Sequence, residues 1–321
     1  MNYKSFSDLS SDVGRSLHKL PSGFDLVVGI PRSGMIPAYM IGLHRNLPVC
    51  DLQALIENRA LASGSTRKMG VEHIKHAQDA RSILVVDDSI ATGKSLESAR
   101  KMIESAGLSE KVQYAVVYAT AESAGLVDYH VEIISIPRFF QWNVMHRREV
   151  SRFCFDIDGV LCVDPTSAEN DDGVAYNGFL AAARPHCLPS YEVGYLVTSR
   201  LEKYREQTEA WLAAHGIRYK HLYMLNLESA EERRKAGAHG KFKAEVYRSL
   251  DDAILFIESE SSQAIEIARE SGKPVLDFGS QVIVRPGFGV RSTEWAIKDK
   301  IFRIKRKVKA RLAFISSNEN R

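Results

Sequence analysis

The stretch ILVVDDSIATGKSL, residues 83–96, indicates a strand, an acidic strand end, a turn and a helix start in the first part of the chain. Four apolar residues, 83–86, predict a buried strand, and Asp87 and Asp88 follow at its end. Small residues then lead into a segment that predicts a helix. The motif contains Gly-Lys-Ser, as many ATP-binding loops do, but Asp88 stands where such a loop requires its first glycine. The sequence therefore argues against an ATP-binding loop.

The turn after the acid pair predicts a phosphate site. A helix N-terminus presents free N–H groups and the positive end of the helix dipole, which together favour a bound phosphate. The adjacent carboxylates of Asp87 and Asp88 would repel a polyphosphate unless sugar hydroxyls or a metal ion lay between. We therefore expect a ligand that carries a phosphate at one end and a diol or a metal beside it.

This pattern resembles the PRPP motif of the type I phosphoribosyltransferases, which bind 5-phosphoribosyl-1-pyrophosphate (PRPP). The resemblance covers residues 85–96. It implies that Asp87 and Asp88 hold the ribose hydroxyls, and that the following turn holds the 5-phosphate through Ala91, Thr92, Gly93, Lys94 and Ser95. The alternative is an ordinary strand-to-helix turn with a solvated acid pair.

A second glycine-containing turn lies about 54 residues upstream, in FDLVVGIPRSGMIP. A strand at residues 26–30 runs into this turn, and an apolar helix follows. The turn resembles the pyrophosphate loop of the same family, which implies contacts to pyrophosphate from Gly29, Arg32, Ser33 and Gly34. Residues 57–70 between the two motifs are polar and basic. They are either a mobile surface loop or a lid that brings Arg67 and Lys68 to the pyrophosphate.

Further strands at residues 112–118 and 131–135 alternate with helical stretches, which predicts a doubly wound parallel α/β sheet. The segment RFFQWNVMHR, residues 138–147, follows the last of these strands. Its aromatic residues belong either to the core or to an acceptor-binding surface formed with Trp142 and Asn143. The resemblance implies that Mg²⁺ on the pyrophosphate neutralises charge during transfer.

The second half of the chain opens with FCFDIDGVLCVDPT, residues 153–166. Asp156 and Asp158 lie two apart at a strand end and so point toward one site. The pattern resembles motif I of the haloacid dehalogenase superfamily. The resemblance implies that Asp156 attacks phosphorus, that Asp158 is the acid/base, and that both bind Mg²⁺, Asp158 through its main-chain carbonyl. An acidic turn that binds calcium or nothing is the alternative.

Three more motifs follow in the order that this superfamily has. They imply that Thr198 contacts the phosphoryl group, that Lys243 (preferred over Lys241) balances its charge, and that Glu258 is a further metal ligand, followed by Glu260. The superfamily usually has Asp at the Glu258 position. Only 40 residues separate Asp158 from Thr198, which leaves room for a small cap at most.

Length and composition predict two domains in a chain of 321 residues: 1–148 and 149–295, with a tail at 296–321. Both domains are expected to be doubly wound, Rossmann-like parallel sheets in tandem. The four cysteines form no C-x-x-C pair, so we expect neither a zinc site nor a disulfide framework. We find neither a secretory signal nor an apolar run of membrane-spanning length, and therefore expect a cytoplasmic protein.

The tail carries the positive charge of the chain. Residues 298–321 hold nine of the 43 Lys and Arg and two of the 40 acids, so the remainder is net acidic. Apolar residues recur at helical spacing, which predicts a basic amphipathic helix. It either docks on its own protein or lies on anionic lipid at the inner face of the membrane. We do not expect nucleic-acid binding, because the tail has no recognisable nucleic-acid-binding fold.

The two halves together predict a bifunctional enzyme that transfers 5-phosphoribosyl from PRPP to an acceptor and then hydrolyses the 5-phosphate. The architecture resembles bacterial phosphoribosyltransferase–phosphatase pairs that install ribofuranose in surface polysaccharides, which implies a sugar hydroxyl of a lipid-linked glycan as acceptor. A nucleobase acceptor, coupled to 5′-nucleotidase action, is the alternative. A regulatory PRPP-binding module is a third reading. The sequence leaves open the acceptor, the anomeric configuration and the oligomeric state, with a homodimer as one option.

Overall fold

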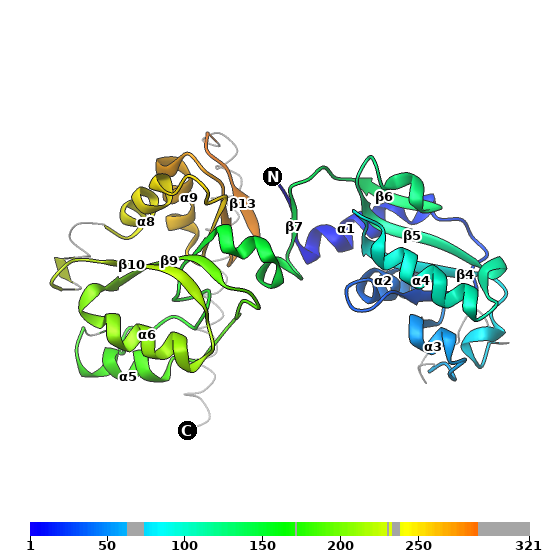
Figure 1. Cartoon of the computed structure of the whole chain (residues 1–321), viewed down its shortest axis with the longest axis horizontal. Helices are drawn as coiled ribbons and strands as arrows, with labels where there is room; N and C mark the ends of the chain where they lie inside the picture. The colour runs from blue at the N-terminus through cyan, green and yellow to red at the C-terminus, as the bar shows by residue number, and fades with distance from the viewer. Residues whose placement is uncertain (63–73, 171, 230, 233–237, 288–321) are drawn as a thin grey trace, which may run out of the picture. The chain divides into compact units, whose positions relative to one another are not determined.

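The structure is a computed structural model that describes residues 1–62, 74–170, 172–229, 231–232 and 238–287. The chain divides into two compact units, Met1–Val144 and Met145–Arg321 (Figure 1). The predicted basic helix at 296–321 and the lid residues Arg67 and Lys68 lie outside the described residues. Among the helices of the described part, none combines the length and apolar character that crossing a membrane requires.

The first unit is built on a parallel sheet, as predicted. Its strands, in sheet order, are β3 (Val49–Asp51), β2 (Leu26–Gly29), β4 (Ile83–Ser89), β5 (Val112–Ala119) and β6 (Tyr129–Ile133). The central strands β2 and β4 are apolar along most of their length because helices cover both faces of the sheet. Strand β6 begins and ends two residues before the segment that the sequence predicts.

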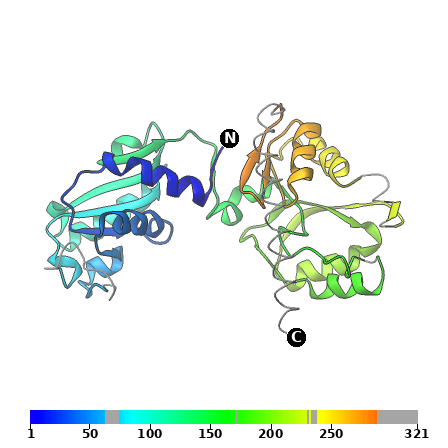
Figure 2. The same ribbon diagram turned by 180° about the vertical axis from the view of Figure 1, so that it is seen from behind.

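Helices cover the two faces of this sheet separately. On one face lie α1 (Phe6–Ser16) and α2 (Met35–Arg45), and on the other lie α3 (Leu52–Ile56) and α4 (Lys94–Ser105). Figure 1 shows α4 across the near face, and Figure 2 shows α1 and α2 across the opposite face. Alternate residues of β4 divide between the two cores, Val85 with α4 and Val86 with α2.

A second, two-stranded sheet pairs the N-terminal segment of the first unit with its C-terminal segment. Strand β1 (Asn2–Lys4) pairs in parallel with β7 (Arg138–Phe140), with Tyr3 opposite Phe139. No local sequence pattern indicates this pairing, because it joins residues more than 130 positions apart. It places the aromatic segment after β7 beside helix α1, where Phe6 lies 5.5 Å from Trp142 between ring centroids.

The second unit is built on a larger sheet. Its strands, in order, are β10 (Tyr219–Leu225), β9 (Val193–Leu201), β8 (Phe153–Phe155), β11 (Leu255–Glu258), β12 (Val275–Asp277) and β13 (Val282–Val284). The first five are parallel, as predicted, but β13 is antiparallel to β12. The predicted doubly wound parallel sheet is therefore present, with one antiparallel strand added at its edge. Only residues 278–281 connect the two strands, and so short a connection permits only an antiparallel return.

Helices again lie on both faces of the second sheet. Helices α8 (Ala238–Ser249) and α9 (Ser261–Ser271) pack on one face around Tyr247 and Phe256. Helices α5 (Val174–Ala182) and α6 (Arg205–Ala214) lie on the other (Figure 1). Helix α5 occupies the connection between β8 and β9, where the sequence predicts a small cap. Short 3-10 helices complete the described elements: η1 (Leu17–Lys19), η2 (Ala77–Asp79), η3 (Ser109–Lys111), η4 (Ala124–Leu126), η5 (Val144–His146), η6 (Arg148–Arg152) and η7 (Glu202–Tyr204).

Candidate functional site

The acid pair of the first unit lies near the end of strand β4, which continues past both residues to Ser89. Side chains alternate along a strand, so the two acids point to opposite sides. Asp88 is buried, with 4% of its surface exposed, and Asp87 is half-buried. Oδ1 of Asp87 accepts a hydrogen bond of 2.8 Å from the main-chain N–H of Asp88. The pair is thus divided into one enclosed and one more accessible carboxylate.

Asp88 joins three predicted parts of the site. Its Oδ1 accepts from the hydroxyl of Ser33 at 2.7 Å, and its Oδ2 accepts from Nε1 of Trp142 at 2.7 Å. Ser33 belongs to the predicted pyrophosphate loop and Trp142 to the predicted acceptor surface. The structure therefore brings the two loops and the aromatic segment together around one carboxylate.

The carboxyl of Asp87 is a much weaker acid than that of an ordinary aspartate. Burial and the neighbouring charge of Asp88 raise the pKa of Asp87 from 3.8 to about 8. A carboxyl with such a pKa holds a proton near neutrality in the ligand-free protein. A ligand that donates hydroxyl hydrogen bonds, or brings positive charge, would favour its ionised form.

The predicted phosphate turn is accessible and its entry is fixed. Ala91, Thr92, Lys94 and Ser95 are exposed, and Gly93 adopts a positive φ of 77° as the residue before helix α4. A positive φ at this position favours glycine. The turn thus presents the start of α4 to solvent, as a phosphate site requires.

Two side chains hold the main chain at the start of this turn. The carbonyl of Ile90 accepts from Nη2 of Arg138 at 2.6 Å and from Oγ of Ser123 at 3.0 Å. Arg138 is buried and comes from β7, and Ser123 precedes η4. Arg138 begins the aromatic segment, and nothing in the local sequence indicates that it reaches Ile90.

The other loop approaches β4 so closely that it needs a glycine. A Cβ atom on Gly34 would lie 2.6 Å from the Ile30 carbonyl oxygen and 2.7 Å from that of Val86. Both neighbours are backbone, so they could yield only by moving the loop or the strand. The peptide bond Pro31–Arg32 is cis, and Arg32 is exposed beside it.

The aromatic segment packs in the core and also reaches the acid pair, while its part in binding an acceptor stays a prediction. Phe140 is buried and stacks on Trp142 with ring centroids 4.9 Å apart. Trp142 is half-buried with its N–H on Asp88. Oδ1 of Asn143 is buried and has no hydrogen-bond partner among the described residues.

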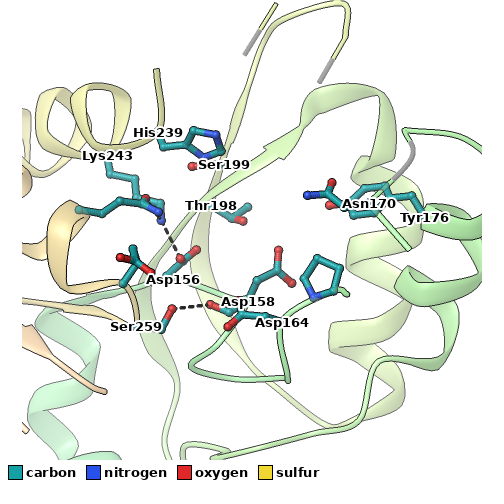
Figure 3. Close-up of a pocket in the computed structure, with 13 residues that line it drawn as sticks. Asp156, Asp158, Asp164, Asn170, Tyr176, Thr198, Ser199, His239, Lys243 and Ser259 are labelled. Atoms are coloured by element: carbon teal, nitrogen blue, oxygen red, sulfur yellow. Dashed lines mark hydrogen bonds and ion pairs between the residues drawn. The ribbon is translucent and has the colours of Figure 1, made fainter. Parts of the chain in front are cut away.

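The second unit has a pocket of about 320 Å³ at the carboxyl ends of β8, β9 and β11 (Figure 3). Asp156 and Asp158 come directly after β8, Thr198 lies in β9, and Lys243 reaches the pocket from α8. The pocket therefore gathers the four predicted catalytic residues from three segments of the chain. Strand β9 runs on to Leu201, so Thr198 is buried within the strand and does not end it.

Lys243 is the centre of this group. Its Nζ donates to Oδ2 of Asp156 at 2.6 Å, to Oε2 of Glu258 at 2.7 Å and to Oε1 of Gln263 at 3.0 Å. Its side chain is 1% exposed. Lys241, the alternative that the sequence leaves open, is exposed. Only Lys243 of the two is placed among the acids.

One buried cation thus faces two buried carboxylates. Burial raises the pKa of Asp156 although the Lys243 ammonium lowers it, and the pKa of Glu258 rises to about 7 for the same reason. Burial lowers the pKa of Lys243, but Asp156 and Glu258 outweigh it, so the net shift is upward. One negative charge of the trio is left without compensation, which favours a proton or a metal ion nearby.

Asp158 is held by a residue that the sequence analysis does not single out. Nη2 of Arg200 lies 2.6 Å from Oδ1 of Asp158, and Nε lies 3.2 Å from Oδ2. Arg200 is 1% exposed and also contacts the hydroxyl of Thr208 and the sulfur of Cys162. The sequence shows that Arg200 directly follows Thr198 and Ser199, but it does not indicate that the partner of Arg200 is Asp158, 42 residues away.

The oxygen donors of the pocket are of the kind that Mg²⁺ prefers. Asp156 offers a carboxylate, and the main-chain carbonyl of Asp158 faces Ser259, whose hydroxyl donates to it at 3.1 Å. Glu258 is turned to Lys243 and to the N–H of Glu260, whereas Asp164 and Glu260 line the pocket. Within the part of the chain that the structure describes, no group of three or more His, Cys, Asp and Glu side chains is arranged to hold a metal. The assignment of Asp156, Asp158 and Glu258 to Mg²⁺ stays a prediction.

The first part of the chain is similar to known proteins. Residues 7–149 match the family model "Phosphoribosyl transferase domain". Xanthine-guanine phosphoribosyltransferase of Cereibacter sphaeroides is 26% identical over 120 residues, which are 37% of this chain and 68% of that protein.

Two solved structures are also similar. The Helicobacter pylori xanthine-guanine-hypoxanthine phosphoribosyltransferase has 20% identity and a TM-score of 0.33, covering 44% of this chain and 93% of its own. A purine phosphoribosyltransferase of Pyrococcus horikoshii has 18% identity and a TM-score of 0.32, covering 44% and 92%.

Proposed function

We propose that this protein, whose N-terminal half contains a type I phosphoribosyltransferase domain, makes a 5-phosphoribosyl product and then removes its 5-phosphate. The observation that carries the second step is the contact of Lys243 with Asp156 and Glu258 beside Asp158 and Thr198, in one pocket. A phosphatase unit on the same chain would complete the conversion of PRPP into an unphosphorylated ribosyl unit.

In the first step the acceptor attacks the anomeric carbon of PRPP while the bond to pyrophosphate breaks, and the proton of the attacking group passes to the departing pyrophosphate or to solvent. The exposed turn at residues 91–95 would hold the 5-phosphate, and the acid pair the ribose hydroxyls. Arg32 and Ser33 would hold the pyrophosphate that leaves. Holding the ribose between fixed contacts lowers the entropic cost of reaching the transition state. Mg²⁺, when bound with PRPP, supplies positive charge for the departing pyrophosphate.

In the second step Asp156 attacks the phosphorus of the 5-phosphate, and the ribose 5-oxygen leaves with a proton from Asp158. Water then attacks the phosphoaspartate, with Asp158 accepting its proton, which releases phosphate and restores Asp156. Lys243 would offset the negative charge of the phosphorylated carboxyl. Arg200 would hold Asp158 in one orientation through both steps.

Asp156 and the Asp158 carbonyl are the residues that would hold Mg²⁺ in the second unit. The fit rests on the uncompensated buried negative charge and on the oxygen donors. When bound there, Mg²⁺ would draw negative charge from the phosphate oxygens.

For the acceptor we propose a sugar hydroxyl of a lipid-linked glycan. The support is the single helix α5 that the described residues place between β8 and β9, which leaves the pocket without a large cap. A bulky phosphomonoester can reach such a pocket by its phosphoribosyl end. Peripheral contact with a membrane through the residues of the tail would suit such an acceptor.

A nucleobase is the second candidate acceptor. The observation that favours it is the similarity to a protein named xanthine-guanine phosphoribosyltransferase. The product of the first step would then be a nucleotide, and the second unit would convert it to a nucleoside.

The test supplies PRPP and Mg²⁺ with either a lipid-linked oligosaccharide or a set of nucleobases, and uses Asp156→Asn to trap the phosphorylated product. Mass spectrometry of the acceptor should show added phosphoribose with the variant and added ribose with the wild type. Asp251→Asn is the matched control, because Asp251 is an exposed aspartate of the same unit. Nucleotide formation would overturn the glycan assignment, and free ribosyl product from Asp156→Asn would overturn the phosphatase assignment.

A further inference from the structure

Asp88 is enclosed by donors from two different segments. Ser33 Oγ donates to one carboxylate oxygen and Trp142 Nε1 to the other, both at 2.7 Å. Ser89 adds a longer contact of 3.4 Å to Oδ2. Hydrogen bonds to a charged acceptor are directional and stronger than those between neutral groups. The orientation of this carboxylate is therefore set by the protein before any ligand binds.

The indole of Trp142 is itself held in place. It stacks on Phe140 at a ring-centroid distance of 4.9 Å with an interplanar angle of 13°, and Phe6 lies 5.5 Å away at 40°. Phe140 in turn stacks on Tyr118, whose hydroxyl donates to the buried Asp12 at 2.9 Å. The near-parallel stack on buried Phe140 fixes the plane of the indole and with it the direction of its N–H, whereas Phe6 is exposed and only tilted against the ring.

We propose that Trp142 is a positioning residue for Asp88: its N–H orients the buried carboxylate that faces the ribose of PRPP. The inference rests on the proposed function, which places the ribose at the acid pair. It changes the role of Trp142 from a surface that only receives the acceptor to one that also prepares the donor site. The aromatic stack and the donor site are then connected through a single hydrogen bond.

Trp142→Phe separates the two roles. The substitution keeps an aromatic ring for Phe140 and Phe6 to contact but removes the N–H. Replacement of Trp142 by 3-benzothienylalanine is a stricter version, because sulfur takes the place of the N–H and the bicyclic shape is kept. Phe6→Leu is the matched control: it removes an aromatic neighbour of the same indole and leaves the Asp88 hydrogen bond in place.

The measurement is the dissociation constant of PRPP with Mg²⁺ and without acceptor, by titration calorimetry. We expect both Trp142 variants to bind PRPP about 10- to 100-fold more weakly, the range for losing a hydrogen bond to a charged group. Phe6→Leu should bind PRPP as the wild type does. The melting temperature, measured on the same samples, reports loss of packing separately.

Asp88→Ala distinguishes failure of this inference from failure of the proposed function. If Asp88→Ala weakens PRPP binding and both Trp142 variants bind like the wild type, the positioning role is wrong. If Asp88→Ala also binds PRPP like the wild type, the assignment of the acid pair to the ribose is wrong, and the inference fails with it. Weakening by Phe6→Leu equal to that of Trp142→Phe would show that packing, and not the N–H, is responsible.

Discussion

The ammonium of Lys243 lies 2.6 Å from the carboxylate of Asp156, although the two residues are 87 positions apart in the sequence. Lys243 comes from helix α8 and Asp156 from the end of β8, so the contact exists only in the folded second unit. Both groups are buried, so bulk water compensates little of either charge. Each charge therefore depends on the other for its compensation.

Lys243→Met should lower the free energy of unfolding by about 3–5 kcal/mol, since it leaves Asp156 and Glu258 buried without a counter-charge. Lys241→Met is the control, because Lys241 is exposed two residues earlier on the same helix, and a change within about 0.5 kcal/mol is expected. Urea denaturation measures both. Adding Glu258→Gln to Lys243→Met should restore part of the loss, and equal costs for the two lysines would contradict the buried ion-pair argument.

Arg200→Lys should lower phosphatase activity about tenfold or more while phosphoribosyl transfer stays unchanged. A lysine has one charged nitrogen and cannot reproduce the two-nitrogen contact of Arg200 with Asp158, and a hydrogen bond between charged groups contributes about 1.5–3 kcal/mol. Arg205→Lys, at a surface site paired with Glu202 and Glu209, is the control. Equal rates for all three proteins would refute a role of Arg200 in orienting Asp158.

Gly34→Ala should destabilise the first unit by about 1–3 kcal/mol and weaken PRPP binding. The added Cβ meets the backbone of Ile30 and Val86, so the loop must move away from β4. Gly14→Ala is the opposite case: Gly14 lies exposed in α1, where a Cβ would meet nothing within 4 Å. It should stabilise by about 0.5–1 kcal/mol. Denaturant unfolding and PRPP titration on both variants test the contrast, which would fail if Gly34→Ala were neutral.

Stability should depend on pH through Asp87. Its pKa is 3.8 for an ordinary aspartate and about 8 in the folded protein, so the folded state binds more protons than the unfolded state between these values. The contribution to stability is therefore complete below pH 4 and is lost as pH rises toward 8.

Asp87→Asn removes this titration. The difference in unfolding free energy between Asp87→Asn and the wild type should shift in favour of the variant from pH 5 to pH 8. Asp251→Asn, which changes an exposed carboxylate, should run parallel to the wild type. A pH-independent difference for Asp87→Asn would mean that Asp87 is ionised throughout.

Much of this architecture could be predicted from local sequence. An apolar run followed by acids and a glycine-containing turn specifies a strand, its carboxyl end and a helix start within about a dozen residues, as in residues 83–96 and 26–37. Each of these segments folds as predicted, and parallel strands then bring their ends to one edge of the sheet. The meeting of Asp156 and Thr198 follows from the same rule, whereas Lys243 reaches them from helix α8.

The remaining contacts could not be predicted, because they join residues that no local pattern connects. Trp142 meets Asp88 across 54 positions, and Arg200 meets Asp158 across 42. Strand β7 meets β1 across the whole first unit. In the first two cases a polar side chain far along the chain pairs with a carboxylate, and in the third the main-chain groups of two distant strands pair with each other. Sequence indicates that such a group needs a partner but does not say which residue supplies it.

The two hydrogen bonds that Arg138 and Ser123 donate to the Ile90 carbonyl bear on the entropy and the rate of phosphate binding at the turn. Because the entry to the turn at residues 91–95 is already fixed, a phosphate that binds there has little backbone disorder to remove. The affinity of the turn then loses little to conformational entropy, and association is expected to be fast at this turn, since its anchored entry does not have to rearrange first.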